Sequence, residues 1–334
     1  MTIDVHAHLL LPAVQAEVQR RDPEGVAEAA ALELTRNGGE SLAASGAMIG
    51  ARIPKLTAVE ARLAAMDEQG VDTQWVSASP NHFYPWAGAS LAVWTATEAN
   101  RLIAEHVGAA PERLVGLGLV PLQHPDRIVE CLDDAVVARG LAGVEISSFA
   151  GDVELSDERL EPFWARAAEL GAVIFLHPFG CSLDERLDRF YLSNTVGQPT
   201  ENAVALSHLI FAGVLDRHPD LKIVAAHGGG YLPFAIGRSD RAWNVRPEAQ
   251  RCAHAPSSYL KKMWFDTVVH DPVALRHLVE VAGASQVVLG SDFPFDMGLD
   301  DPVSLVRGAG LPTEVTERIL TGNAEALLHT KVPA

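Results

Sequence analysis

Eight short apolar segments, each followed by a longer segment with helical spacing of its apolar residues, constrain the fold of this chain more than any other feature. The apolar segments have the length of buried strands and lie near residues 2–6, 71–77, 114–120, 142–147, 172–176, 221–225, 263–269 and 286–290. The helix-patterned segments lie near residues 57–69, 89–107, 125–139, 156–169, 200–217, 230–242, 272–282 and 301–328, the last interrupted by Gly308 to Pro312. Eight strands that alternate with eight helices predict an α/β fold of the (β/α)8 TIM-barrel type, in which the carboxyl ends of all strands meet on one face.

Two connections are too long for ordinary turns in such a barrel. Residues 9–56 follow the first strand and are rich in Ala, Glu and Gly, so we expect a small helical insertion that forms a lid over the barrel mouth. Residues 178–199 follow the fifth strand and include Phe190, Tyr191 and Asn194. Because no repeat or low-complexity tract interrupts the pattern, we expect one domain over residues 1–334.

The composition is that of a globular protein with a large core, since 48% of the residues are hydrophobic and 21% are charged. The 43 acidic and 26 basic residues give a net charge of −17, which repels phosphate. This charge argues against nonspecific binding to nucleic acid or to an anionic membrane. If the substrate is an anion, arginines must reverse the field locally.

The cysteines and the N-terminus both indicate a cytoplasmic protein. Cys131, Cys181 and Cys252 have no C-x-x-C spacing, so neither a disulfide framework nor a thiolate zinc site is indicated. The N-terminus has no basic region followed by an apolar stretch, and no segment approaches the roughly 18 apolar residues that a membrane helix needs.

Side chains that can bind a metal ion recur where the predicted strands end. His6 and His8 are two residues apart on the first strand, so both imidazoles point to the same face. His177, His227 and Asp292 follow the apolar segments that end near residues 176, 225 and 290, each beside a Gly or Pro turn. In a barrel these five side chains converge at one mouth, and imidazole and carboxylate are ligands that suit zinc and its neighbours.

Each of these residues also has a structural alternative. His6 and His8 could form a polar pair in the barrel core, although two buried imidazoles without partners would cost several kcal/mol in desolvation. His177 could be a hydrogen-bonded residue at a strand end, His227 a turn residue before three glycines, and Asp292 the cap of a turn.

Several motifs together resemble the amidohydrolase superfamily, in particular its decarboxylase branch typified by 2-amino-3-carboxymuconate-6-semialdehyde decarboxylase. The resemblance extends over the full length of the chain. It rests on Asp4-Val5-His6-Ala7-His8, Met66-Asp67-Glu68-Gln69-Gly70-Val71, Leu176-His177-Pro178, Ala226-His227-Gly228-Gly229-Gly230, Pro233-Phe234, Gly237-Arg238, Val269-His270-Asp271-Pro272 and Gly290-Ser291-Asp292-Phe293-Pro294-Phe295.

The resemblance implies a mononuclear zinc site in which His6, His8, His177 and Asp292 are the ligands; manganese is the alternative metal. It also implies that His227 does not bind the metal but transfers protons beside it, with Asp292 as a second proton carrier. No organic cofactor is expected, because the chain has no dinucleotide or P-loop glycine motif.

The resemblance also implies residues that bind the substrate carboxylate. Arg238 matches a family arginine that reaches into the neighbouring subunit's site, and Arg52 lies near the position of a second arginine. An arginine shared in this way requires at least a homodimer. Asn194 occupies the position of a tryptophan in the wall of the muconate-semialdehyde enzymes, so we expect a related substrate and not the same compound.

The expected function is therefore metal-dependent, nonoxidative decarboxylation of an aromatic or muconate-type carboxylic acid. The alternative is a metal-dependent hydrolase or hydratase of the same superfamily acting on a ring-cleavage-type acid, since the ligand set alone does not separate the two. A third interpretation, a nonenzymatic metal-binding or scaffold protein, predicts a closed coordination shell.

The remaining histidines and aromatic residues give weaker signals. His270 lies at the end of the seventh predicted strand, but His-Asp-Pro is also a good helix entry. Three aromatic residues follow the second predicted strand: Phe83, Tyr84 and Trp86. They either line the pocket or only pack against other apolar side chains. Eight other histidines have no recurring context and are expected at the surface or in helices: His82, His106, His124, His208, His218, His254, His277 and His329.

Overall fold

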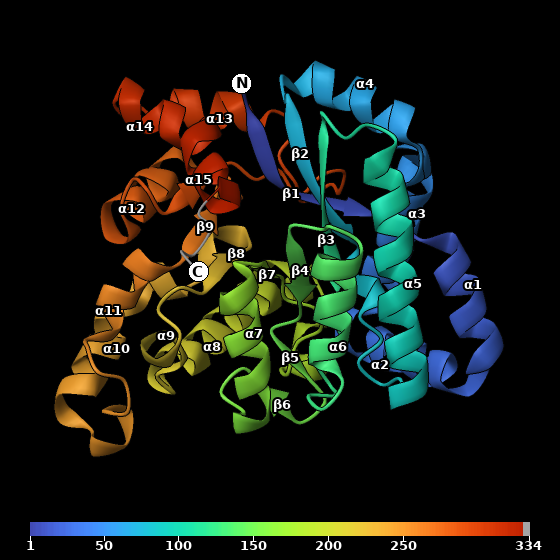
Figure 1. Ribbon diagram of the computed structural model, residues 1–334, viewed down its shortest axis with the longest axis horizontal. Helices are drawn as coiled ribbons and strands as arrows, with labels where there is room; N and C mark the ends of the chain where they lie inside the picture. Colours follow the sequence, from blue (N-terminus) through green and yellow to red (C-terminus); the bar gives the residue numbers. More distant parts are fainter. Residues whose placement is uncertain (330–334) are drawn as a thin grey trace.

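The computed structural model describes residues 1–329, and in this range eight parallel strands form one barrel sheet (Figure 1). The expected domain runs to residue 334, so its last five residues lie outside the described range. The strands, in their order around the sheet, are β1 (Ile3–Leu9), β2 (Thr73–Ala78), β3 (Leu114–Leu119), β4 (Gly143–Ile146), β7 (Val173–Leu176), β8 (Lys222–Ala225), β9 (Trp264–Asp266) and β10 (Val287–Val288). This order confirms the predicted (β/α)8 barrel.

The barrel is completed where its first strand meets its last. The backbone N–H of Val5 donates to the carbonyl of Leu289 at 2.8 Å, and that of His8 donates to the carbonyl of Phe293 at 2.7 Å. In Figure 1 the N-terminal strand accordingly lies beside the C-terminal helices. Both ends of the described chain therefore contribute to one seam of the barrel.

Helices surround the sheet at close to the predicted positions. The main ones are α4 (Val59–Gln69), α5 (Ala89–Gly108), α6 (Ile128–Asp133), α7 (Glu161–Leu170), α8 (Gln198–Phe211), α10 (Leu232–Val245), α12 (Pro272–Ala282), α13 (Pro302–Gly308), α14 (Thr313–Glu317) and α15 (Asn323–His329). Asp271 and Asp301 cap α12 and α13, since their carboxylates accept hydrogen bonds from backbone N–H groups of the first turn. No helix of the described chain is long and apolar enough to cross a membrane.

Strand alternation divides the apolar side chains into two layers. Residues such as Val5, Trp75 and Phe175 fill the interior of the barrel, together with Leu117 and Val224. A larger cluster fills the space between the sheet and the helices. Burial on both faces explains why the strands read as continuous apolar runs in the sequence.

The predicted insertion after β1 is helical, as expected. It consists of α1 (Pro12–Arg21), α2 (Pro23–Asn37) and α3 (Gly39–Thr57), which lie to one side of the barrel in Figure 1. The turn between α2 and α3 packs against the connection that follows β7: a side chain at Gly38 would place its Cβ 1.9 Å from the carbonyl oxygen of Asp188. Gly38 also has a φ of 74°, so glycine is required here for two reasons. The function of this insertion as a lid stays a prediction.

Some local features differ from the sequence expectation. A small antiparallel pair, β5 (Phe149–Ala150) and β6 (Val153–Glu154), follows β4 and was not predicted. β9 and β10 are shorter than their apolar segments, because the chain leaves the sheet to form the site. His82 lies in a short 3-10 helix (Pro80–His82), in agreement with the expectation of a surface or helix position, and it is buried: its Nδ1 lies 3.0 Å from the carbonyl of Ser79, and its Nε2 accepts the N–H of Leu11.

Candidate metal centre

An irregularity in β1 aims both of its histidines into the barrel mouth. Ile3 and Val5 pack inside the barrel, and the pairing register with β2 then shifts between Asp4 and Ala7. The shift reverses the alternation, so that His6 and His8 also face inward, whereas strict alternation from Val5 would turn His6 outward. Both histidines are fully buried.

The ligand atoms of this pair lie next to a carboxylate from the opposite end of the sequence. His6 Nε2 and His8 Nε2 are 3.0 Å apart, and Asp292 Oδ1 lies 3.3 Å from the first and 3.1 Å from the second. Asp292 is placed by the seam of the barrel, since its backbone N–H donates to the carbonyl of His6 at 2.9 Å. The closure of the barrel thus brings the three side chains together.

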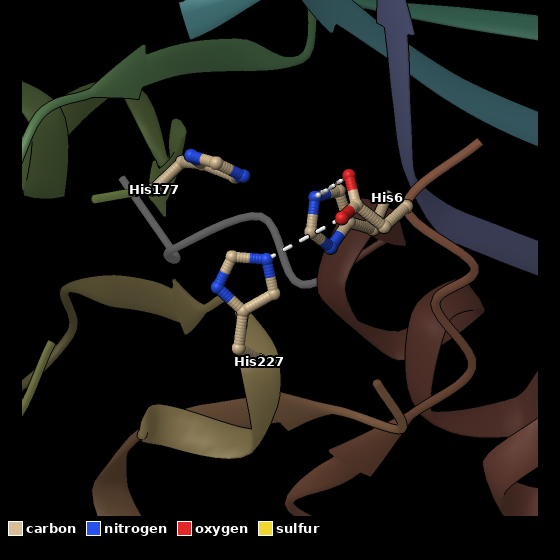
Figure 2. Close-up of side chains that lie close together, drawn as sticks. His6, His177 and His227 are labelled. Carbon is tan, nitrogen blue, oxygen red and sulfur yellow. Dashed lines mark ion pairs between the residues drawn. The ribbon is translucent and has the colours of Figure 1, made fainter. Parts of the chain in front are cut away.

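Two further histidines reach the cluster from adjacent strands. Figure 2 shows the rings of His6, His177 and His227 pointing toward one another from separate segments of the chain. His177 follows β7 and His227 follows β8, and their ring centroids are 4.9 Å apart. The ligand atoms of these three histidines and of Asp292 all lie within 4.8 Å of one another. The structure therefore brings together all five side chains that the sequence placed at the mouth.

Hydrogen bonds define which ring nitrogen of two histidines is free. His6 Nδ1 lies 2.6 Å from Asp266 Oδ2, and His177 Nδ1 lies 2.9 Å from the carbonyl of Pro178. In each case Nδ1–H is the donor, so that Nε2 is the ring nitrogen left to bind a metal ion. His177 Nε2 has no hydrogen-bond partner among the described residues although it is buried.

The electrostatics of the cluster favour an ionised carboxylate and two neutral imidazoles. Burial would raise the pKa of Asp292, but the charge of His6 and hydrogen bonding to His227, His6 and His8 hold it well below its usual range. Burial lowers the pKa of His8 to about 4 and that of His177 well below 6.5. A carboxylate beside neutral imidazoles is the state in which these residues bind a divalent cation. His6 differs: burial lowers its pKa, but Asp292 and Asp266 outweigh this and raise it to about 10, so a bound ion must displace the proton on Nε2.

The donor set fits such a cation. Ligand atoms bound about 2.0–2.2 Å from a zinc ion in a tetrahedral shell stand about 3.3 Å from one another. The separations among His6, His8 and Asp292 are close to this value, and the unpartnered Nε2 of His177 supplies a fourth donor. His227 differs, because its side chain is 16% exposed and its Nε2 lies 3.6 Å from Asp292 Oδ2.

The cluster opens onto a cavity of 410 Å³ that His227 and Asp292 line. Asn194 from the connection after β7 and His270 from the segment after β9 also line it, as do Phe234 and Met297. Phe83, Tyr84 and Trp86 are not in this lining and pack against the hydrophobic core instead. A cavity of this size with apolar walls and a few polar groups is typical of small-molecule binding.

Neither predicted arginine lines this cavity within one chain. Arg238 is exposed on α10, four residues beyond the cavity-lining Phe234. Arg52 borders a separate hollow of 70 Å³ beside Phe293 and Phe295. No lysine or arginine of the described chain lines the 410 Å³ cavity. The carboxylate-binding assignments of both arginines therefore stay predictions.

Two buried acids of the site were not predicted. Asp266 orients His6 and also accepts hydrogen bonds from the backbone N–H groups of Gly228 at 2.8 Å and Val268 at 3.1 Å. Glu145 of β4 is fully buried in the barrel, and burial raises its pKa to about 8. An acidic residue inside an otherwise apolar strand is the sequence signal that both share.

Comparisons with known proteins agree with this geometry. The amidohydrolase family model matches residues 3–330. A 2-amino-3-carboxymuconate-6-semialdehyde decarboxylase from Dictyostelium discoideum is 35% identical over 268 residues, which cover 79% of this chain and 75% of that protein. The crystal structure of 5-carboxyvanillate decarboxylase LigW from Sphingomonas paucimobilis matches with a TM-score of 0.83 and 27% identity over 99% of both chains.

A further neighbour shares the fold at lower identity. It is the 5-carboxyvanillate decarboxylase from Novosphingobium aromaticivorans, solved with manganese and 4-hydroxy-3-methoxy-5-nitrobenzoic acid, with a TM-score of 0.83 and 21% identity over 98% of this chain and 96% of that one. The family match and the first relative together show that the chain belongs to the amidohydrolase family. Its similarity to decarboxylases confirms the expected branch of the superfamily.

Proposed function

We propose that this protein is a metal-dependent, nonoxidative decarboxylase of an aromatic or muconate-type carboxylic acid. One observation carries the proposal: a buried cluster of histidines and one aspartate opens onto a 410 Å³ cavity in a chain whose relatives are named decarboxylases. The cavity has the size for one small organic acid. The enzyme class would be a carbon–carbon lyase.

The proposed ligands are His6, His8, His177 and Asp292, and zinc is the expected ion, with manganese as the alternative. Nitrogen and carboxylate donors suit both metals. A bound divalent cation supplies positive charge that orients the acid and polarises its oxygen atoms. Asp266 keeps the His6 ring in the tautomer and orientation that this role needs.

The contribution of the chain itself is proton delivery by His227 or Asp292. These side chains face each other, with 3.6 Å between His227 Nε2 and Asp292 Oδ2, and both line the cavity. A proton moves to the substrate carbon that bears the carboxylate, either from the His227 imidazole or from the Asp292 carboxyl after this ionised group has taken up a proton, and this creates the electron sink for the next step. The carbon–carbon bond then breaks, CO2 leaves, and the electron pair of that bond returns to the organic product.

Substrate recognition would involve Asn194 in the cavity wall and the two arginines. Arg238 is exposed on α10, four residues beyond the cavity-lining Phe234. In the proposed homodimer it would reach the site of the second copy. A guanidinium is the natural bidentate partner of a carboxylate. Arg52 is the second candidate, from the end of the insertion.

The test is to supply candidate acids to the metal-loaded protein and to follow the carboxyl carbon. We would use carboxyl-labelled 2,6-dihydroxybenzoate, 5-carboxyvanillate and a carboxymuconate semialdehyde, and detect labelled CO2 and bicarbonate together with the organic product. We expect equal amounts of CO2 and decarboxylated product from at least one acid. Product without CO2 or bicarbonate would support the hydrolase or hydratase alternative, and the absence of any turnover would contradict the proposal.

A further inference from the structure

His270 lines the cavity, but the proposed proton transfer does not use it. It lies four residues after Asp266, where the chain leaves β9 and approaches α12. Its side chain is exposed and makes no hydrogen bond to any described residue. The imidazole is therefore available to a molecule in the cavity.

The backbone at His270 adopts a conformation that histidine rarely takes. Its φ is 58°, in the left-handed region that glycine and asparagine adopt more easily. The other histidine and the aspartate that line the cavity share this feature, with φ values of 54° at His227 and 60° at Asp292. Strained residues of this kind persist where a side chain is needed in a fixed place, although strain alone does not identify a site, since Phe190 has a φ of 57° outside the cavity.

The surroundings of His270 give its imidazole a specific chemical role. On this side of the cavity the neighbouring lining residues Val268, Val269 and Ala274 offer only hydrocarbon. Partial burial of the ring, and then the charge of His227, lowers the pKa of His270, which favours the neutral ring with one N–H donor and one nitrogen acceptor. A hydroxyl or amino group can pair with such a ring, whereas an unsubstituted hydrocarbon edge cannot.

We propose that His270 is a substrate-binding residue that hydrogen-bonds a hydroxyl or amino substituent of the organic acid. This inference rests on the proposed function, because it assumes that the carboxylate lies at the metal cluster and the remainder of the acid lies in the cavity. Val268 and Val269 contact the hydrocarbon part of the ligand, and His270 recognises its polar substituent. The enzyme therefore selects substituted acids over analogues that lack the polar group.

The experiment measures binding, so that it does not depend on turnover. Benzoate, 3-hydroxybenzoate and 4-hydroxybenzoate are titrated calorimetrically into the zinc-loaded protein, because their hydroxyl groups lie away from the carboxylate. We expect one of the two hydroxybenzoates to bind about tenfold more tightly than benzoate, as one hydrogen bond provides. In His270→Gly this preference falls below about threefold while benzoate binding stays nearly unchanged.

Two variants separate recognition from backbone effects. His270→Asn tolerates the left-handed conformation and keeps a hydrogen-bonding group, so it should retain part of the preference. Phe190→Gly relieves the same backbone conformation outside the cavity and should keep the full preference. Both glycine variants should unfold at or above the wild-type temperature, because glycine adopts this conformation without strain.

The outcomes that contradict this inference differ from those that contradict the proposed function. An unchanged hydroxyl preference in His270→Gly, an equal loss in Phe190→Gly, or no hydroxyl preference in the wild type would each overturn the role of His270. Absence of CO2 release with the binding preference intact would overturn the decarboxylase proposal only.

Discussion

His177 and His227 lie side by side, but their ring nitrogens are held differently. His177 Nδ1–H donates to the carbonyl of Pro178, which leaves the buried Nε2 without a partner, whereas His227 Nε2 faces Asp292 from a partly exposed position. The first arrangement is that of a metal ligand. The second is that of a group that exchanges protons with a molecule in the cavity.

This difference predicts distinct effects for two substitutions. His177→Ala should lose bound metal and activity together, because it removes a ligand from the set. His227→Ala should retain metal but lose CO2 release by at least about a hundredfold, the usual contribution of an acid–base group. Metal content by mass spectrometry, measured beside turnover, distinguishes them. Full turnover in His227→Ala would contradict its assignment, and loss of its metal would identify it as a ligand.

Asp266 also acts as a single residue, because it orients His6 through one hydrogen bond. Asp266→Asn should weaken metal binding by about 10- to 100-fold, as is usual when the partner of a metal-bound histidine is changed. Competition with a fluorescent chelator measures the affinity. Asp271→Asn is the control, since Asp271 is an acid near the site whose carboxylate only caps α12. Equal affinities for both variants and the wild type would contradict the orienting role.

At the scale of single elements, β4 contains the least expected charge. Glu145 faces the barrel interior beside the inner core, and neither of its carboxylate oxygens has a hydrogen-bond partner among the described residues. Burial raises its pKa from 4.5 to about 8, and the nearby Ser77 offsets this only in part. The protonated form is therefore the one that the fold favours.

The raised pKa of Glu145 makes the stability of the metal-free protein depend on pH. Below pH 4.5 the carboxyl is protonated in both the folded and the unfolded chain, and its contribution to stability is complete. Between pH 4.5 and about 8 only the unfolded chain ionises, so stability falls by up to about 1.4 kcal/mol per pH unit. Glu145→Gln should thus gain stability over the wild type as the pH rises to about 8, and no further above it.

Denaturant unfolding at several pH values measures this effect. The exposed Glu60 on α4 provides the control substitution, Glu60→Gln, which should keep the pH profile of the wild type. A parallel pH profile for Glu145→Gln and the wild type would contradict the buried, protonated state.

The helices and strands also show which features could be predicted from the sequence. The strands and the ends that carry His6, His8, His177, His227 and Asp292 were predictable, because buried parallel strands produce apolar runs and their carboxyl ends share one face. Asp266 and Glu145 were not found, since one acid within an apolar run has no periodic signal. The position of Arg52 beside a separate hollow depends on how the insertion packs, which a local pattern does not determine.

At the scale of the whole molecule, the metal ligands come from the beginning and the end of the barrel. His6 and His8 are in β1, and Asp292 follows β10, so a bound ion would join the two strands that complete the sheet. Ligands that bind only the folded state stabilise it by mass action. The ion is therefore expected to contribute to stability as well as to chemistry.

Metal removal tests this expectation. Treatment with a chelator, followed by its removal, should lower the unfolding temperature by several degrees, and added zinc or manganese should restore it. His177→Ala should show little difference between the two conditions. A wild-type unfolding temperature that is independent of metal would show that the ion does not join these strands.

The irregular register of β1 has a consequence for comparing this chain with distant relatives. One residue more or fewer between Val5 and His6 would turn both imidazoles away from the mouth while every letter of the His-Ala-His motif remained. Matching the motif alone is then a poor guide to metal binding, and the count of residues that precede it within the strand is the property to compare.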